Sequence, residues 1–230
     1  MKAVEKLNIV FMGTPDFAVP CLERLLADGH NVSLVVTQAD KPKGRGHQLA
    51  APPVKECALT HNIPVYQPAT LRSEEAASRL AAEQADVFVV VAYGKLLPLT
   101  LLSMPRYGCI NVRGSLLPKY RGAAPIQWTV LNGDREGGVT TMRMDEGMDT
   151  GDMLLTARVP VPEEMTAGEL YDQLAPLGAS LLSETLARLD DLVPQKQDEA
   201  LATHAPMLSR ALSPLDFSLS AATLHNTCAG

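Results

Sequence analysis

Short apolar runs alternate with amphipathic stretches along the first part of the chain. An apolar run, a helical pattern and a β-branched run follow one another within about thirty residues, the length of a βαβ unit, and predict a strand at 7–12, a helix at 17–28 and a strand at 32–37. Asp16 is placed to cap this helix and Gly29 to end it. The sheet is therefore expected to be parallel at its start.

The same patterns predict the later elements. The run V-F-V-V-V-A at 87–92 has no polar alternation, as expected for a central strand that is buried on both faces. Further strands are expected at 109–112, 139–144 and 153–159, helices at 54–60, 73–83, 122–131 and 166–189, a loop at 38–53 and a turn or helix at 98–104. Pro176 is able to interrupt the last helix. The order of elements predicts an α/β fold.

The C-terminal third changes in composition. A chain of 230 residues with 46% hydrophobic content can bury one sizeable α/β core. Residues 190–214 are polar, with prolines at 194, 206 and 214, so we expect a core domain at 1–193, a linker at 194–214 and the start of a second domain at 215–230. A C-terminal tail docked on the core is an equally good interpretation of 215–230.

Several classes of protein are excluded by composition. The longest purely apolar stretch, 87–92, is too short to span a membrane, and the start M-K-A-V-E-K-L lacks the apolar core of a signal peptide. The four cysteines are far apart without a C-x-x-C pair and the histidines show no ligand spacing, which predicts a cytoplasmic protein with neither a disulfide framework nor a metal site. G-T-P at 13–15 is not a dinucleotide-binding fingerprint.

The net charge of −6 argues against general nucleic-acid binding. One local exception is the basic stretch K-P-K-G-R-G-H at 41–47, where glycines on both sides of Arg45 would let a loop fit a phosphate backbone. A solvated run of charges is the alternative interpretation of this stretch.

Polar residues end the strand predicted at 109–112. Open parallel sheets place their sites at the carboxyl ends of strands, and Asn111 and Arg113 point to one side of this strand while Val112 points to the core. Gly114 then lets the chain turn close to a ligand. We therefore expect a functional site here, although a strand-end asparagine also commonly satisfies local backbone groups.

The string N-V-R-G-S-L-L-P-K-Y-R-G-A-A-P-I-Q at 111–127 resembles the signature of formyltransferases that use 10-formyltetrahydrofolate, with Arg113 where that family carries histidine. The loop M-D-E-G-M-D-T-G-D at 144–152 is similar to the family's second motif and places its catalytic aspartate on Asp149, although D-T-G-D is also ordinary turn chemistry. The resemblance implies a Rossmann-like, mostly parallel sheet with helices on both faces. It also implies 10-formyltetrahydrofolate as co-substrate, no metal, and folate contacts from Ser115, Leu116, Leu117, Pro118 and the main chain near Val91 and Tyr93.

Three further segments resemble the branch of this family that formylates methionine on initiator tRNA: 11–18, 37–46 and 215–222. This resemblance implies formyl transfer to methionyl-tRNA, with tRNA contacts from Lys41, Lys43 and Arg45 and a C-terminal tRNA-contacting domain of which 215–230 would be the start. We expect a monomer. Two alternatives remain: a UDP-sugar formyltransferase, which shares S-L-L-P-K-Y-R-G, and a non-catalytic folate or tRNA binder.

Arg113 is the reason to consider a non-catalytic folate or tRNA binder. A guanidinium stays charged at all relevant pH values, so it can donate to an oxyanion but cannot move protons as an imidazole does. We expect Arg113 to pair with Asp149 and to fill the volume where the formyl group should lie. The resemblance together with this substitution predicts an impaired enzyme.

Overall fold

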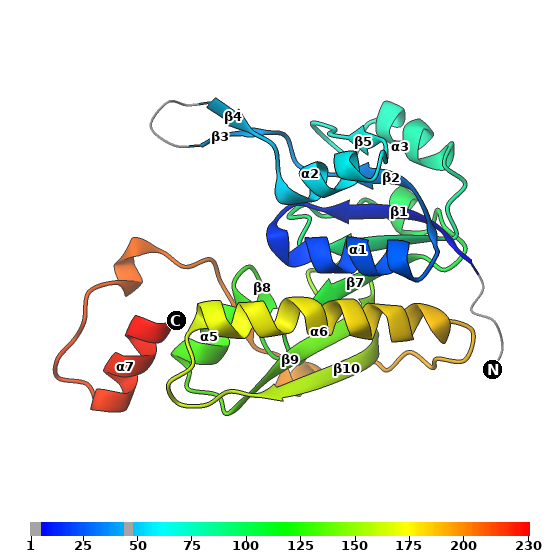
Figure 1. Ribbon diagram of the computed structural model, residues 1–230. Coiled ribbons are helices and arrows are strands. Elements are labelled where there is room, and N and C mark those ends of the chain that lie inside the picture. The colour runs from blue at the N-terminus through cyan, green and yellow to red at the C-terminus, as the bar shows by residue number, and fades with distance from the viewer. Residues whose placement is uncertain (1–5, 44–47) are drawn as a thin grey trace.

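The computed structural model describes residues 6–43 and 48–230, and its centre is a seven-stranded sheet with the order β10-β9-β7-β6-β1-β2-β5 (Figure 1). The βαβ unit predicted at the start is confirmed: β1 (Asn8–Gly13) and β2 (Asn31–Val36) pair in parallel, joined by α1 (Val19–Ala27). Gly29, with φ of +82°, ends the turn after α1. The parallel part of the sheet is completed by β5 (Val65–Tyr66), β6 (Val87–Val91) and β7 (Cys109–Arg113).

The strand β6 lies in the middle of the sheet, and all five of its residues are buried, as its continuous apolar sequence predicts. At one edge the direction reverses, because β9 (Glu136–Arg143) runs antiparallel to both β7 and β10 (Met153–Pro160). The sheet is thus mostly parallel with an antiparallel margin.

Helices cover both faces of the sheet, as predicted. One face carries α1, α2 (Pro53–Thr60), α5 (Pro125–Leu131) and α6 (Ala167–Ala187), whose apolar residues share one core with alternate residues of the central strands. The opposite face is covered by α3 (Glu74–Ala81), which Ser73 caps, and by the short α4 (Leu99–Leu102). Each layer buries its own hydrophobic cluster.

The start of α1 differs from its prediction, because Asp16 does not cap that helix. Residues Asp16–Ala18 form a 3₁₀ turn, and the N-cap of α1 is Ala18, which makes no side-chain cap hydrogen bond. The Asp16 carboxylate instead accepts hydrogen bonds from the Phe17 N–H and the Tyr171 hydroxyl. A tertiary partner on α6 therefore holds the residue that the local pattern assigned to a cap.

Pro176 does not interrupt α6, a second difference from the predicted possibility. The helix runs unbroken for 21 residues, with nearly half of its residues buried against the sheet and a capping box between Thr166 and Glu169 at its start. Gly178 lets it approach β7 closely, since a Cβ there would lie 3.0 Å from a methyl group of Val112. Packing over the full length of the helix outweighs the missing backbone donor of proline.

The segment 38–53, predicted as a loop, contains a hairpin of β3 (Lys41–Lys43) and β4 (Gln48–Ala50), which projects from the end of β2 (Figure 1). The glycines and Pro42 suggested irregular structure, but Pro42 is compatible with a two-stranded ribbon whose outer edges are unpaired. A polar cluster holds the base of the hairpin: Lys55 pairs with Asp40, and the Gln67 amide donates to the Asp40 carboxylate at 2.8 Å. The hairpin is thereby fixed to α2 and the end of β5.

The helix predicted at 122–131 begins later, at Pro125, because Arg121–Gly122 forms a short strand, β8, that pairs in parallel with β11 (His204–Ala205). The segment 194–214, expected to be a linker, therefore returns to the main body and also contains the 3₁₀ turns η2 (Glu199–Leu201) and η3 (Arg210–Leu212). A pairing between residues some eighty positions apart leaves no local sequence signal.

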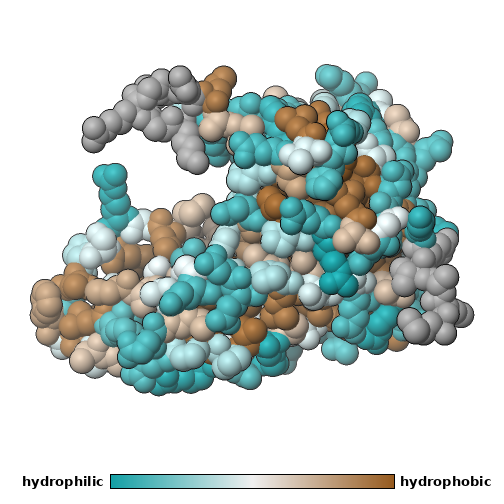
Figure 2. All heavy atoms as spheres, viewed as in Figure 1, coloured by the Kyte–Doolittle hydropathy of each residue, from teal (hydrophilic) through white to brown (hydrophobic). Residues whose placement is uncertain are grey.

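The last helix, α7 (Ala221–Ala229), packs against α5, and the His225 ring lies 3.0 Å from the Glu163 carbonyl oxygen. The segment that leads to it exposes large apolar side chains, among them Met207, Phe217 and Leu219. Figure 2 shows hydrophobic side chains gathered over this end of the molecule. Among the described residues, no helix combines the length and the apolar character that a membrane span requires. That residues 215–230 begin a second domain stays a prediction.

Candidate active site

The candidate site lies at the carboxyl ends of β6 and β7, where the sequence placed it. Asn111 pairs in register with Val90, and Val112 pairs with Val91, so the ends of both strands meet. Val112 faces the core, while Asn111 is only 9% exposed and its amide makes no side-chain hydrogen bond to any described residue. An amide without a partner at a strand end is a donor available to a ligand.

Arg113 forms an ion pair with Asp149, as the sequence predicts. Its Nη2 lies 3.1 Å from Oδ2 of Asp149, and the two side chains are only 17% and 11% exposed. Burial lowers the pKa of Arg113 below its usual value, and the neighbouring carboxylate opposes this effect only in part. The guanidinium remains a cation near neutral pH. Nε of Arg113 is buried and has no hydrogen-bond partner among the described residues. The ion pair with Asp149 therefore holds the guanidinium, while its Nε–H forms no hydrogen bond to the described residues.

Asp149 is fixed through its backbone as well as its carboxylate. It adopts a left-handed conformation, with φ of +56°, in the loop between β9 and β10, and its Oδ2 accepts the Gly122 N–H at 2.8 Å. The Gln197 side-chain amide donates to the carbonyl oxygens of Asp149 and Gly151, at 2.8 and 2.7 Å. This loop is also packed tightly on β9, since a Cβ at Gly151 would lie 1.8 Å from the Arg143 carbonyl oxygen.

Gln197 is in turn bound by Arg121, which connects it to β8. Nε and Nη2 of Arg121 donate to Oε1 of Gln197 at 3.0 and 2.8 Å, and the same guanidinium makes two hydrogen bonds to the Glu199 carboxylate. The hydrogen bonds to Glu199 raise the pKa of Arg121. We call Arg121, Gln197 and Glu199 the Gln197 network; it holds the loop that carries Asp149.

Sequence reasoning missed this network. Gln197 and Glu199 lie in a polar, proline-containing segment, and nothing in that segment's composition distinguishes a buried glutamine from a solvated one. Arg121 lies inside the K-Y-R-G string, which was the one available signal.

Replacing Gln197 by alanine should destabilise the protein by about 2 kcal/mol, because the change removes a buried amide that donates to the buried Gly151 carbonyl and the part-buried Asp149 carbonyl. Chemical denaturation measures the effect. Gln195→Ala is the matched control, since Gln195 contacts Met153 through its backbone and its side chain makes no hydrogen bond to any described residue. Equal effects of the two substitutions would contradict the proposed support of the Asp149 loop.

The S-L-L-P loop is pinned to β9 by Thr140. The Thr140 hydroxyl donates to the Ser115 carbonyl oxygen at 2.7 Å and accepts the Leu117 N–H at 3.2 Å. Beyond the loop, Leu116, Leu117 and Pro118 line a cavity of about 690 Å³. This cavity is not lined by Asn111, Arg113 or Asp149, so the loop contributes to two separate surfaces.

Two buried hydroxyl groups near these strand ends lack a hydrogen-bond partner among the described residues: the Ser115 Oγ and the Tyr93 hydroxyl. Tyr93 lies just after β6, and burial raises its pKa to about 12, so the hydroxyl keeps its proton. The Tyr93 carbonyl oxygen is already occupied, because it accepts hydrogen bonds from Gln38 at 2.8 Å and Thr14 at 3.3 Å. These contacts join the G-T-P turn and the start of the hairpin segment to the end of β6.

Two of the three predicted tRNA contacts, Lys41 and Lys43, lie on β3 of the hairpin, which leaves the same carboxyl edge of the sheet as the candidate site. Lys41 is exposed at the start of β3. Lys43 ends β3, and Arg45 lies outside the described residues. The structure thus brings Asn111, Arg113 and Asp149 to one site, which continues into Ser115–Pro118. It puts Lys41 and Lys43 on a separate projection.

The fold and the motifs around this site define a formyl transferase, and the family model of that description matches residues 7–186. The chain belongs to the formyl transferase family. Among curated relatives it is similar to a methionyl-tRNA formyltransferase of Acetivibrio thermocellus, 51% identical over 97% of this chain and 73% of the relative. It is 53% identical to a methionyl-tRNA formyltransferase of Acidobacterium capsulatum over the same shares of the two chains.

Solved structures agree on the fold. A phosphoribosylglycinamide formyltransferase from Bacillus halodurans superposes with a TM-score of 0.66 at 27% identity, over 80% of this chain and 95% of that one. An N-formyltransferase from Helicobacter canadensis, in complex with folinic acid and dTDP-3-aminofucose, gives a TM-score of 0.74 at 21% identity, over 96% of this chain and 79% of that one.

Proposed function

We propose that this chain carries the scaffold of an enzyme that transfers a formyl group from 10-formyltetrahydrofolate to the amino group of methionyl-tRNA. The observation that carries the proposal is identity of about 50%, along nearly the whole chain, to relatives with that named activity. In this proposal the enzyme is a monomer that acts in translation initiation in the cytoplasm.

The reaction needs a donor for the formyl oxygen and a group that manages protons. The substrate amine attacks the formyl carbon, the bond from that carbon to the folate nitrogen breaks, and one proton passes from the amine towards the folate. The unpartnered amide of Asn111 suits stabilisation of the negative charge that develops on the formyl oxygen. Asp149, fixed by Gly122 and the Gln197 network, suits orientation of a neighbouring acid–base group.

Arg113 stands where the resemblance places that acid–base group. Its guanidinium is bound to Asp149 at 3.1 Å, so the aspartate holds a permanent cation instead of a titrating imidazole. We therefore propose an impaired catalyst on an intact scaffold. If the impairment is complete, the chain binds folate or tRNA but transfers no formyl group.

The residues near the strand ends fit a folate co-substrate, which supplies the formyl group. A flat pterin ring needs an apolar surface together with polar groups at its edge. The S-L-L-P loop provides leucine and proline side chains, and the hydroxyl groups of Ser115 and Tyr93 are buried without a described partner. Ser115, Leu116, Leu117 and Pro118 would hold the ring, with the main chain from Val91 to Tyr93 on the adjacent strand end.

Transfer to a nucleotide-linked amino sugar is the second candidate function. Structural neighbours with that activity have the same fold, but they are about 20% identical to this chain. The basic stretch at 41–47, with Lys41, Lys43 and Arg45, favours a polyanionic acceptor.

The acceptor can be identified by binding, independently of turnover. We expect the chain to bind methionyl-tRNA, and Arg45→Ala to weaken tRNA binding about tenfold while leaving the affinity for 5-formyltetrahydrofolate unchanged, because loss of one phosphate contact acts only on the tRNA. Fluorescence anisotropy with labelled tRNA and calorimetry with the folate measure the two affinities.

Arg188→Ala is the matched control for this experiment, since Arg188 is an exposed arginine at the distant end of α6. Equal tRNA affinity of the Arg45 and Arg188 variants would remove the hairpin from the tRNA site. Binding of a dTDP-linked amino sugar in place of tRNA would favour the second candidate function.

A further inference from the structure

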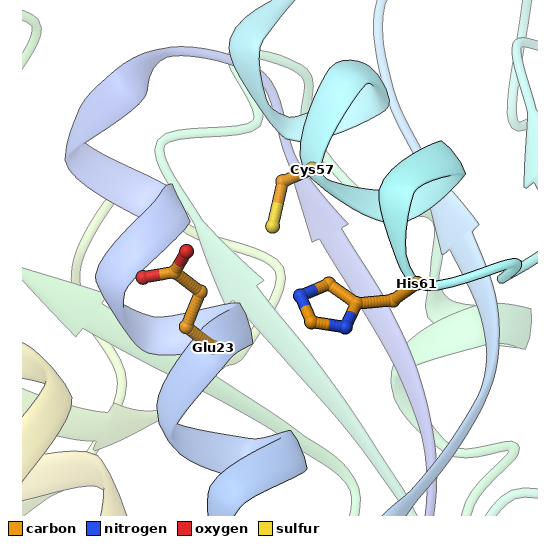
Figure 3. Close-up of side chains that lie close together, drawn as sticks. All are labelled: Glu23, Cys57 and His61. Carbon is orange, nitrogen blue, oxygen red and sulfur yellow. The ribbon is translucent and has the colours of Figure 1, made fainter.

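Three side chains with metal-binding chemistry converge between α1 and α2. Glu23 comes from α1 and Cys57 and His61 come from α2 and its C-cap, and one ligand atom of each lies within 4.8 Å of the other two. Figure 3 shows the carboxylate, the thiol and the imidazole turned toward one another across the gap between the two helices. The group lies outside the candidate active site.

The fold explains why these residues meet. Cys57 and His61 are four positions apart, so they lie on the same face of α2 one turn from each other. The helices α1 and α2 are neighbours on the same face of the sheet, and Cys57 packs partly buried against their shared core. Glu23, on the exposed side of α1, closes the triangle. In the sequence the acid is 34 positions from the thiol, so ligand spacing alone does not indicate the group.

None of the three side chains is committed to another polar partner. The carboxylate of Glu23 makes no hydrogen bond or ion pair to the described part of the chain, and the same holds for the His61 ring and the Cys57 thiol. A cysteine that served only as a small hydrophobic residue would not need an imidazole and a carboxylate at its sulfur. The ligand atoms of the cluster are therefore unused, and two of its three side chains, those of Glu23 and His61, are exposed.

We propose that Glu23, Cys57 and His61 form a binding site for a zinc-like divalent transition-metal ion that joins α1 to α2. One thiolate sulfur, one imidazole nitrogen and one carboxylate oxygen are a ligand set that suits Zn²⁺ and Co²⁺ and excludes the hard ions Mg²⁺ and Ca²⁺. Three protein ligands leave the fourth tetrahedral position for water. Around such an ion the ligand atoms lie about 3.5 Å apart, so the triangle needs to contract by about 1 Å.

The thiol must lose its proton for this site to form. Burial, and then the charge of Glu23, raise the pKa of Cys57, so the free thiol is protonated near neutral pH. Metal binding forms the sulfur–metal bond and releases that proton to the solvent. The positive charge of the ion then offsets the repulsion between the thiolate and the Glu23 carboxylate, because it contacts both groups.

Cobalt titration of the purified, metal-free chain tests the proposal. We expect a thiolate-to-cobalt charge-transfer band in the near ultraviolet and intense visible bands of a tetrahedral ion, saturating at one Co²⁺ per chain and displaced by Zn²⁺. Saturating Zn²⁺ should raise the Tm of the chain by about 5 °C, because an ion that binds only the folded state stabilises it.

Cys57→Ser should abolish the charge-transfer band and the shift in Tm, and Glu23→Gln and His61→Gln should each weaken Co²⁺ binding at least tenfold. Cys228→Ser and His225→Gln are the matched controls, since Cys228 is the exposed cysteine and His225 lies 3.9 Å from the Glu164 carboxylate on another surface. The site is rejected if no charge-transfer band appears, or if the band persists in Cys57→Ser and disappears in Cys228→Ser. Because both readouts are independent of formyl transfer, failure of this proposal leaves the proposed function untouched.

Discussion

Arg113→His should raise the rate of formyl transfer to methionyl-tRNA by about 10²- to 10⁴-fold, the usual contribution of a general acid–base group. The substitution breaks the ion pair with Asp149 at 3.1 Å and returns a group that titrates near neutral pH beside that carboxylate. It also shortens the side chain and frees volume next to Asn111. Single-turnover formylation with 10-formyltetrahydrofolate and methionyl-tRNA measures the change.

Two further variants separate the chemical from the steric effect of this substitution. Arg113→Ala opens the same volume without supplying a proton carrier, so its rate should stay far below that of the histidine variant. Arg188→His controls for a general effect of replacing an arginine, since Arg188, at the end of α6, is exposed and forms an ion pair with Glu184. Equal rates for the unchanged chain and Arg113→His would overturn our interpretation of the site.

Asp149→Asn should destabilise the chain by about 3 kcal/mol, since it leaves the largely buried Arg113 guanidinium without its charge partner. The Gly122 N–H and the Arg113 guanidinium both contact Oδ2, so an asparagine oxygen in that place still accepts from both, and the loss comes from the missing negative charge. Urea denaturation, followed by circular dichroism, measures the loss.

Glu136→Gln is the matched control for Asp149→Asn, because it removes the charge from an ion pair with Arg158 whose two side chains are about 60% exposed. That change should alter stability by less than about 0.5 kcal/mol. In the Arg113→His background the cost of Asp149→Asn in stability should shrink, while formyl transfer should fall again. Equal destabilisation in both backgrounds would show that Asp149 acts on stability through contacts other than Arg113.

The sheet and most helices were predictable because their signals are local. The apolar run of β6 indicates a central strand by itself, and Ser73 occupies the cap position from which it accepts the Ala76 N–H. The wrong predictions involve distant partners instead. Asp16 turns to Tyr171 on α6, and Arg121–Gly122 leaves the helical pattern to pair with His204–Ala205.

The candidate site was predictable where it coincides with motifs. Asn111 and Arg113 follow from strand alternation, and the pairing of Arg113 with Asp149 follows from the chemistry of the two groups. The Gln197 network could not be predicted, because one buried amide in a polar segment has no periodicity. The Glu23–Cys57–His61 cluster depends on how closely α1 and α2 pack, a distance that neither helix encodes alone.

The Gln197 network also sets how short a working formyl transferase of this kind can be made. The family match ends at residue 186, and every strand of the main sheet lies before that point. Gln197 and Glu199 lie beyond it, yet they hold the loop that carries Asp149. A chain cut at the family boundary would keep the complete sheet and lose the anchor of its candidate catalytic aspartate. The smallest unit that retains the site extends through β11, so for this protein the boundary of the fold and the boundary of the function are different residues.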